Sequence, residues 1–221
     1  MTPRTLRGVL YGHGRMGRFH AAKLAQRADI EFCVVDPKVG LRAAPTETPD
    51  FAIIATPTTS HAAIAEPLLQ KGVPCLVEKP LAGTVDEAKQ LAQFTHLCVG
   101  HIERFNPVMS TIKCRDVEYI EVERLSPFSE RGTDVDVIDD LMIHDLDLLN
   151  QFMPGPIVDV RAKGVGILTQ KPDIVNVRLE VALENGGIGV ANMSASRVSA
   201  RQCRTWRLVE PSRYWRLDLK N

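Results

Sequence analysis

Three observations predict an α/β fold for this 221-residue chain, with a parallel sheet followed by a shortened α+β domain that has an open, mainly antiparallel sheet. Short apolar runs alternate with helical patterns through the first hundred residues, as in βαβ units. From about Val117 apolar residues instead recur at every second position, the period of a half-buried strand. Asn185–Gly186–Gly187 then supplies a hairpin turn, which is typical of antiparallel strands.

The first domain is expected to span residues 1–101. Its buried strands are short apolar runs, expected at Arg7–Tyr11, Ile30–Val35, Phe51–Ala55, Val73–Val77 and Leu97–Val99. Its helices are expected at Met16–Arg27, at Ser60–Lys71 with Ser60 as a possible N-cap, and from about Val85 behind Thr84. Because helices separate strands of one sheet, those strands should be parallel.

The second domain is expected to span residues 102–221. Its alternating strands are expected at Val117–Leu125, Ile157–Gly166, Ile174–Leu183, Ile188–Met193, Cys203–Val209 and Tyr214–Leu219. One helix, Asp140–Phe152, interrupts them. A sheet with one covering helix leaves its second face open, so we expect a homodimer or homotetramer formed through this sheet.

The composition excludes some classes of protein. Lys plus Arg and Asp plus Glu both number 27, so no net charge favours nucleic acid or an anionic membrane as partner. The five cysteines are scattered without a CxxC pair, which favours reduced thiols over a zinc site or redox couple. No signal peptide and no run of roughly 20 apolar residues is present, so we expect a cytoplasmic protein.

A GxGxxG motif, Gly12–Gly17, directly follows the first strand and opens the first helix, the context of a dinucleotide-binding loop. Gly12 permits the tight turn, Gly14 lets a pyrophosphate approach the backbone, and Gly17 lets the helix pack on the strand. The amides around Arg15 and Met16 at the helix start would then meet the phosphates. A glycine-rich turn without a ligand is the alternative.

Asp36 ends the second strand about 20 residues after the glycines, where a carboxylate binds a ribose 2′-hydroxyl in such domains. It would repel a 2′-phosphate, so NAD is favoured over NADP as the cofactor. Alternatively, Asp36 is a turn residue before Pro37.

Further motifs follow at the ends of later strands: Ala55-Thr56-Pro57 with His61, then Glu78-Lys79-Pro80, and later Asp140-Leu-Met-Ile-His144-Asp-Leu-Asp147. Together with the glycine loop, this set resembles the glucose-fructose oxidoreductase, inositol dehydrogenase and MocA-like family. The resemblance implies an NAD-dependent dehydrogenase with a Rossmann domain and a second domain whose open sheet often forms an oligomer interface.

The resemblance also implies roles for single residues. Lys79, Asp140 and His144 would be catalytic, and the Lys79–Pro80 bond would be cis. The expected cofactor-binding residues are Gly12, Gly14, Arg15, Met16, Gly17, Asp36, Thr56, Pro57, His61, Glu78, Lys79 and Arg104. Arg104 could instead simply tie the two domains together.

The residue types fit this chemistry. A spacing of four places Asp140 and His144 on one helix face, with Asp147 three residues further on. Oxidation of a secondary alcohol needs a base for the hydroxyl proton, which suits histidine, while the Lys79 ammonium could stabilise the developing alkoxide. A surface charge cluster and a carboxylate–histidine metal site are the alternatives.

The substrate is expected to be a small molecule. The stretches Gly100–Pro107 and Ser129–Val137 most resemble the branch of the family that oxidises UDP-N-acetylglucosamine at its 3-hydroxyl. Arg104, Arg124 and Arg131 lie in or beside these stretches and could meet the diphosphate, or could pair with nearby acidic residues. A free sugar or polyol such as inositol is the alternative substrate.

Two features depart from the family pattern. Only the short connection Pro37–Asp50 joins the second and third strands, so one wall of the adenine pocket should be thin. The sequence also ends at Asn221, just after a strand, where relatives usually continue. A catalytically inactive NAD-binding sensor is therefore the alternative from another class, although Lys79, Asp140 and His144 are all present.

Overall fold

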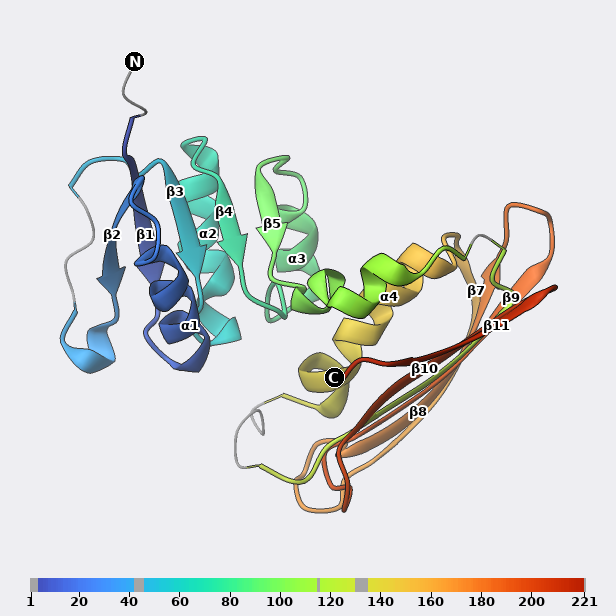
Figure 1. The fold of residues 1–221 in the computed structure, drawn as a ribbon. Coiled ribbons are helices and arrows are strands. Elements are labelled where there is room, and N and C mark those ends of the chain that lie inside the picture. The colour runs from blue at the N-terminus through green and yellow to red at the C-terminus, as the bar shows by residue number, and fades with distance from the viewer. Residues whose placement is uncertain (1–3, 42–45, 115, 130–134, 221) are drawn as a thin grey trace. The chain divides into compact units, whose positions relative to one another are not determined.

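The computed structural model describes residues 4–41, 46–114, 116–129 and 135–220. The chain divides into two compact units, Met1–Gly100 (unit 1) and His101–Asn221 (unit 2). Each unit has its own sheet (Figure 1). Within the described residues, no helix is long and apolar enough to cross a membrane.

Unit 1 is built on five parallel strands. These are β1 (Leu6–Tyr11), β2 (Ile30–Val35), β3 (Phe51–Ile54), β4 (Cys75–Val77) and β5 (Leu97–Val99). Their order in the sheet is β2-β1-β3-β4-β5. The parallel sheet predicted from the sequence is confirmed. The expected bounds of β2 and β5 match the observed ones, and those of β1, β3 and β4 differ by one or two residues at one end. The short apolar runs bury Val9, Ile54 and Val77 against the helices.

Three α-helices accompany this sheet: α1 (Arg15–Leu24), α2 (His61–Gln70) and α3 (Val85–Leu91). Thr84 starts α3 through a capping box with Glu87, as the sequence indicates. Ser60, expected to cap α2, makes no side-chain cap bond. It belongs to a 3-10 turn, η2 (Thr58–Ser60), and its hydroxyl donates to the carbonyl of Pro57 at 2.8 Å.

The strand order reverses at β1. The chain leaves β1 through α1 to reach β2 on one side, whereas β3 pairs with β1 on the other side (Figure 1). Backbone bonds from Gly12 to Val35 and from Ala55 to Tyr11 tie the carboxyl ends of the three strands together. Open α/β sheets bind their ligands at such a switch point.

Unit 2 contains a six-stranded sheet. Its strands are β6 (Tyr119–Leu125), β7 (Ile157–Val165), β8 (Ile174–Ala182), β9 (Ile188–Ser196), β10 (Cys203–Glu210) and β11 (Arg213–Asp218). In the order β11-β10-β6-β9-β8-β7, the central pair β6–β9 is parallel and the other neighbours are antiparallel. The open, mainly antiparallel sheet is therefore confirmed. Gly186, with φ of 83°, makes the predicted turn between β8 and β9.

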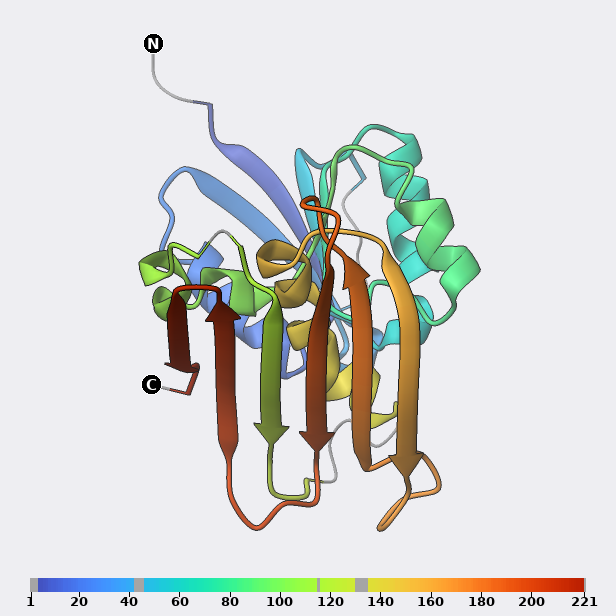
Figure 2. The same cartoon turned by 90° about the vertical axis from the view of Figure 1, so that its right-hand side faces the viewer.

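The inner face of this sheet packs on helix α4 (Ile143–Phe152). Trp206 and Leu208 of β10 and Leu148 of α4 are fully buried there. Figure 2 shows the opposite, outer face toward the viewer, with α4 behind the strands. The expected helix Asp140–Phe152 is not α-helical throughout, because its start is a π-helical turn, η5 (Ile138–Met142).

Short turns precede β6 in unit 2. They are the 3-10 turns η3 (Ile102–Phe105) and η4 (Pro107–Thr111). Asn106 caps η4 by accepting from the amide of Val108 at 3.1 Å, and its amide group donates to the carbonyl of Leu219 at 3.1 Å. These bonds join η4 to the end of the sheet.

Candidate functional site

The glycine loop connects β1 to α1. Gly12 has φ of 91°, and a Cβ there would lie 2.5 Å from the carbonyl oxygen of Ala55. A Cβ on Gly17 would lie 2.0 Å from the carbonyl oxygen of Gly12. At Gly14 no described atom lies within 4 Å of the Cβ position. Gly12 and Gly17 therefore serve internal packing, whereas Gly14 leaves open space beside the backbone.

The first turn of α1 faces this loop. Gly14 occupies the N-cap position and makes no side-chain cap bond, since it has no side chain. Arg15 is exposed and lies over the ring of Phe19 at 5.9 Å, while Met16 is half-buried. Backbone N–H groups at the start of a helix favour an anion, so this turn is suited to a phosphate group.

Asp36 lies at the end of β2 beside the glycine loop. Its carboxylate accepts from the amide of His13 at 2.7 Å and from the amide of Lys38 at 2.9 Å. The bond from His13 is the main cause that lowers the pKa of Asp36. The anion is thus fixed at the loop. The short connection that follows turns at once through η1 (Pro37–Val39), and Leu41 pairs back with Asp36.

A pocket of about 540 Å³ lies at this switch point. Its volume is in the range of small-molecule and cofactor sites, about 300–1,000 Å³. Of the residues expected from the sequence, it brings together Gly12, Gly14, Asp36, Thr56 and Pro57. Sequence reasoning missed other lining residues: Val35, Lys38, Ser60 and Ile64. The signal for them was their place at the carboxyl end of β2 and around the start of α2.

His61, expected to bind the cofactor, supports the pocket from behind and does not line it. Its side chain is 1% exposed. One ring nitrogen lies 2.8 Å from the carbonyl of Pro80 and the other 2.9 Å from the carbonyl of Thr56. Both nitrogens are therefore occupied by backbone. The expectation is corrected: His61 ties the segment after β3 to the segment after β4.

Glu78 and Lys79 follow β4 directly. Glu78 is buried, and its Oε1 lies 2.7 Å from Nε2 of His20 on α1. A Cβ on Gly100 would lie 3.0 Å from the Glu78 carboxyl group, so Gly100 allows this placement. Lys79 is half-buried, and the Lys79–Pro80 bond is cis, as predicted. Sequence reasoning missed His20, because 58 residues separate it from Glu78.

Asp140 and His144 lie on either side of the junction between η5 and α4. Asp140 is in the π-helical turn and His144 is in the first turn of α4. A π-helical turn is wider than an α-helical one, so the α-helical spacing expected from Asp140 onward is interrupted, and the shared helix face of Asp140 and His144 stays a prediction. Both are half-buried. Within the described part of the chain, no three His, Cys, Asp or Glu side chains are grouped to hold a metal ion.

Arg104, expected near the cofactor or substrate, pairs with Asp147 inside unit 2. Its Nε donates to Oδ2 of Asp147 at 2.7 Å, and this side chain raises the pKa of Arg104. Nε2 of His101 lies 3.7 Å from the same carboxylate. Arg104 thus connects η3 to α4, and its side chain is still about half exposed.

Arg124 is not a surface cation that could meet a diphosphate, and that expectation is corrected. It is 3% exposed on the inner face of β6 and pairs with Asp145 and Glu103. Burial of the guanidinium is possible because both carboxylates satisfy its donors. Arg131, the third expected arginine, lies outside the described residues.

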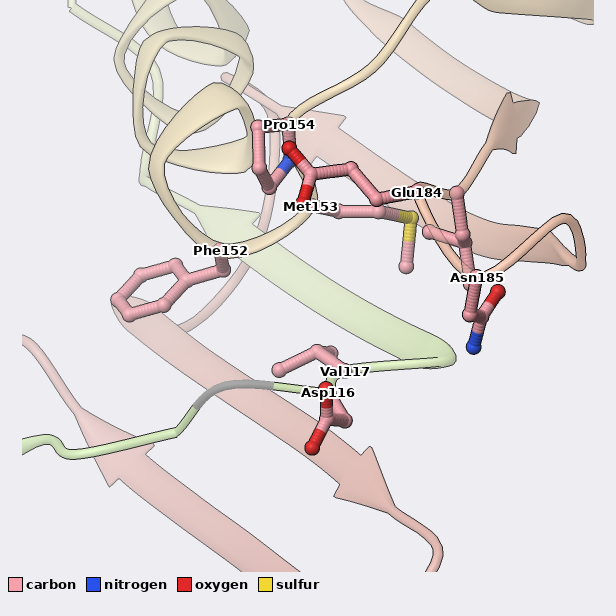
Figure 3. Close-up of a pocket in the computed structure, with 8 residues that line it drawn as sticks. Asp116, Val117, Phe152, Met153, Pro154, Glu184 and Asn185 are labelled. Atoms are coloured by element: carbon pink, nitrogen blue, oxygen red, sulfur yellow. The ribbon is translucent and has the colours of Figure 1, made fainter.

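A second pocket lies at the C-terminal end of α4, beside the turn that joins β8 to β9 (Figure 3). Met153, Glu184 and Asn185 are among its walls. It holds about 80 Å³, well below the about 300–1,000 Å³ of small-molecule and cofactor sites.

The chain is similar to known oxidoreductases. A family model described as an oxidoreductase family with an NAD-binding Rossmann fold matches residues 20–96. UDP-N-acetylglucosamine 3-dehydrogenase of Acidithiobacillus ferrooxidans is 38% identical over 98% of this chain and 75% of the relative. A solved structure of that enzyme superimposes with a TM-score of 0.83 at 36% identity, covering 97% of this chain and 77% of the other. The myo-inositol dehydrogenase Hyg17 of Streptomyces leeuwenhoekii is 30% identical over 67% of this chain and 51% of the relative.

Proposed function

Because the chain belongs to the Gfo/Idh/MocA family of NAD-binding oxidoreductases, we propose that it is a dehydrogenase that oxidises a secondary hydroxyl of a UDP-sugar, the 3-hydroxyl of UDP-N-acetylglucosamine. The observation that carries the proposal is the pocket at the switch point of unit 1, lined by the glycine loop and Asp36. The relative with that substrate matches almost the whole chain.

The residues of unit 1 fit NAD. The open space beside Gly14 is the space that a phosphate needs, and the first turn of α1 offers its amides. The fixed carboxylate of Asp36 would bind ribose hydroxyls and oppose a 2′-phosphate. When bound, NAD accepts the hydride that leaves the carbinol carbon of the substrate.

The proposal gives three side chains separate parts in one reaction. His144 takes the proton of the substrate hydroxyl, and Asp140 orients the histidine ring. The Lys79 ammonium stabilises the negative charge that develops on the same oxygen. Lys79 belongs to unit 1, whereas Asp140 and His144 belong to unit 2. Their common involvement is therefore tested by substitution of each.

The UDP moiety requires local cations, since the chain has no net charge. Arg124 is buried and does not serve, which leaves Arg104 as the described candidate from the sequence. The second candidate substrate is inositol, because a myo-inositol dehydrogenase is also similar to this chain. Inositol carries no diphosphate, so a role for Arg104 in substrate binding is expected only for the UDP-sugar.

Purified protein with NAD should be incubated separately with UDP-N-acetylglucosamine, UDP-glucose and myo-inositol. NADH absorbance and mass spectrometry of the keto product report turnover, and Lys79→Ala serves as the inactive control. We expect turnover of UDP-N-acetylglucosamine. Oxidation of myo-inositol alone would contradict the UDP-sugar as substrate and favour inositol. Oxidation of none of the three compounds would contradict the proposed dehydrogenase activity as a whole.

The proposal includes a homo-oligomer formed through the outer face of the sheet of unit 2. Val165, Ile188 and Tyr214 are exposed apolar side chains on this face, which Figure 2 shows toward the viewer. A groove of about 390 Å³ on the same face carries Arg161 and Arg178. Light scattering at micromolar concentration should give a dimer or a tetramer. A monomer would contradict this part of the proposal.

A further inference from the structure

Helix α4 carries two carboxylates that follow His144 in sequence and reach different partners. Asp145 and Asp147 are two residues apart, so their side chains leave the helix about 160° from each other. Asp145 is 1% exposed and faces the sheet, whereas Asp147 reaches η3. A helix held on two nearly opposite sides cannot rotate about its axis.

The contact of Asp145 with the sheet is made by three donors. Nε of Arg124 donates to Oδ2 at 2.6 Å and Nη2 of Arg124 donates to Oδ1 at 2.7 Å. The indole N–H of Trp206 also donates to Oδ1, at 3.0 Å. Arg124 lies on β6 and Trp206 on the neighbouring β10. Residues of two strands thus bind one carboxylate, Arg124 through two directional hydrogen bonds and Trp206 through one.

The segment η3 links the two sides. Glu103 accepts from Nη1 of Arg124 at 3.0 Å and from Nη1 of Arg204 at 3.1 Å. The next residue, Arg104, binds Asp147 directly. The carboxylates of α4 are therefore connected through adjacent residues of one short turn.

Stability alone does not account for this cluster. Replacement of both members of a buried ion pair by apolar residues of similar volume is often neutral or stabilising, whereas loss of one member costs about 3–5 kcal/mol. A directional, fully satisfied network differs from apolar packing in that it specifies one orientation of the elements that it joins. Here those elements are α4, β6, β10 and η3.

We propose that Asp145 is a positioning residue that, through Arg124 and Trp206, fixes the rotation of α4 and thereby the direction of the His144 ring. This rests on the proposed function in so far as His144 acts as the base. A displacement of about 1 Å at a reacting group can cost roughly 100-fold in rate. Loss of the cluster should therefore lower kcat more than it changes folding or cofactor binding.

The test is the double variant Arg124→Met/Asp145→Leu, which removes both charges and puts apolar side chains in their place. We expect a folded protein with unchanged NAD affinity, little change in KM and a kcat lowered by roughly 10- to 100-fold. Trp206→Phe removes the N–H bond together with part of a buried ring, and it should lower kcat in the same direction with a smaller effect. It also tests the inference if the double variant does not fold. Arg27→Gln/Asp29→Asn, which removes a bidentate pair on the surface of unit 1, is the matched control and should leave kcat unchanged.

A readout without turnover separates this inference from the proposed function. The ring resonance of His144, assigned by its loss in His144→Gln, should shift or broaden in both cluster variants, while the histidines of unit 1 keep theirs. If the wild type oxidises no sugar, the proposed function fails and this resonance alone decides the inference. An unchanged His144 resonance in the folded double variant or in Trp206→Phe would overturn the inference, whatever the turnover.

Discussion

The two glycines Gly14 and Gly17 should respond in opposite ways to the same added methyl group. A Cβ on Gly17 would lie 2.0 Å from the backbone oxygen of Gly12, so the start of α1 must shift by about 1 Å or more. Overpacking costs about 1–3 kcal/mol, and contact with rigid backbone places Gly17→Ala at the upper end. Replacement of a helical glycine by alanine returns about 1 kcal/mol.

The net loss for Gly17→Ala is therefore about 2 kcal/mol. For a unit of the size of unit 1, such a loss lowers the melting temperature by roughly 8–16 °C. Gly14→Ala meets no described atom and should change stability by less than about 1 kcal/mol. Its methyl group fills the space reserved for the pyrophosphate, so NAD affinity should fall at least 10-fold, or about 1.4 kcal/mol.

Thermal or urea unfolding measures the first effect and calorimetric titration of NAD the second. Wild-type protein and the surface variant Arg27→Gln/Asp29→Asn serve as references. A Gly14→Ala protein that binds NAD normally would refute the assignment of the loop to the cofactor. A Gly17→Ala protein as stable as the wild type would refute the packing argument.

Three further predictions follow from the site and its surroundings. NAD should bind more tightly than NADP, because the fixed carboxylate of Asp36 repels a 2′-phosphate. Asp36→Ser should reduce this difference in affinity. Equal affinities of the wild type for NAD and NADP would be inconsistent with this role of Asp36. Lys79→Ala and His144→Ala should each lower turnover by roughly 10²–10⁴-fold and leave NAD affinity nearly unchanged. Steady-state kinetics measures the turnover and titration measures the affinity. Normal turnover in either variant would remove that residue from the mechanism. Asp173→Asn should destabilise the protein by about 3–5 kcal/mol at pH 7 in urea unfolding, since buried Arg197 then loses the negative charge of the carboxylate with which it pairs. Burial alone would raise the pKa of Asp173, but Arg197 and the amides of residues 167–169 hold this pKa well below the usual value of about 3.9. The stabilisation from Asp173 is therefore complete above that value and is lost as pH falls toward the folded-state pKa. The difference in unfolding free energy between wild type and variant should shrink over that pH range, and a constant difference would contradict the assignment.

Local patterns predicted the elements of this fold well. Short apolar runs marked the five strands of unit 1, and alternation marked the strands of unit 2, because burial on two faces or one face leaves a different period. The glycine loop, Asp36 and Thr56 could be placed at one pocket because carboxyl ends of parallel strands share an edge.

Long-range polar contacts could not be predicted in the same way. Nothing in the spacing pairs His20 with Glu78 or Arg124 with Asp145, since these contacts depend on how whole elements pack. The sequence therefore predicted Arg124 as a cation for a ligand, although its side chain is buried. The π-helical turn at Asp140 was missed because such turns are rare and are defined by their i→i+5 backbone bonds, which the apolar pattern does not report.

The parallel pairing of β6 with β9 has a consequence for how unit 2 folds. Both neighbours of β6 come from much later in the chain: Tyr119 is in register with Val190 of β9 and with Val209 of β10. Pairing across such sequence separations is slow, because long loops must close before any contact forms. The meander β7-β8-β9 has only local connections, so we expect it to form first. During synthesis, both edges of β6 should stay unpaired until β9 has been made. We therefore expect this central strand to be the one that most readily forms wrong pairings.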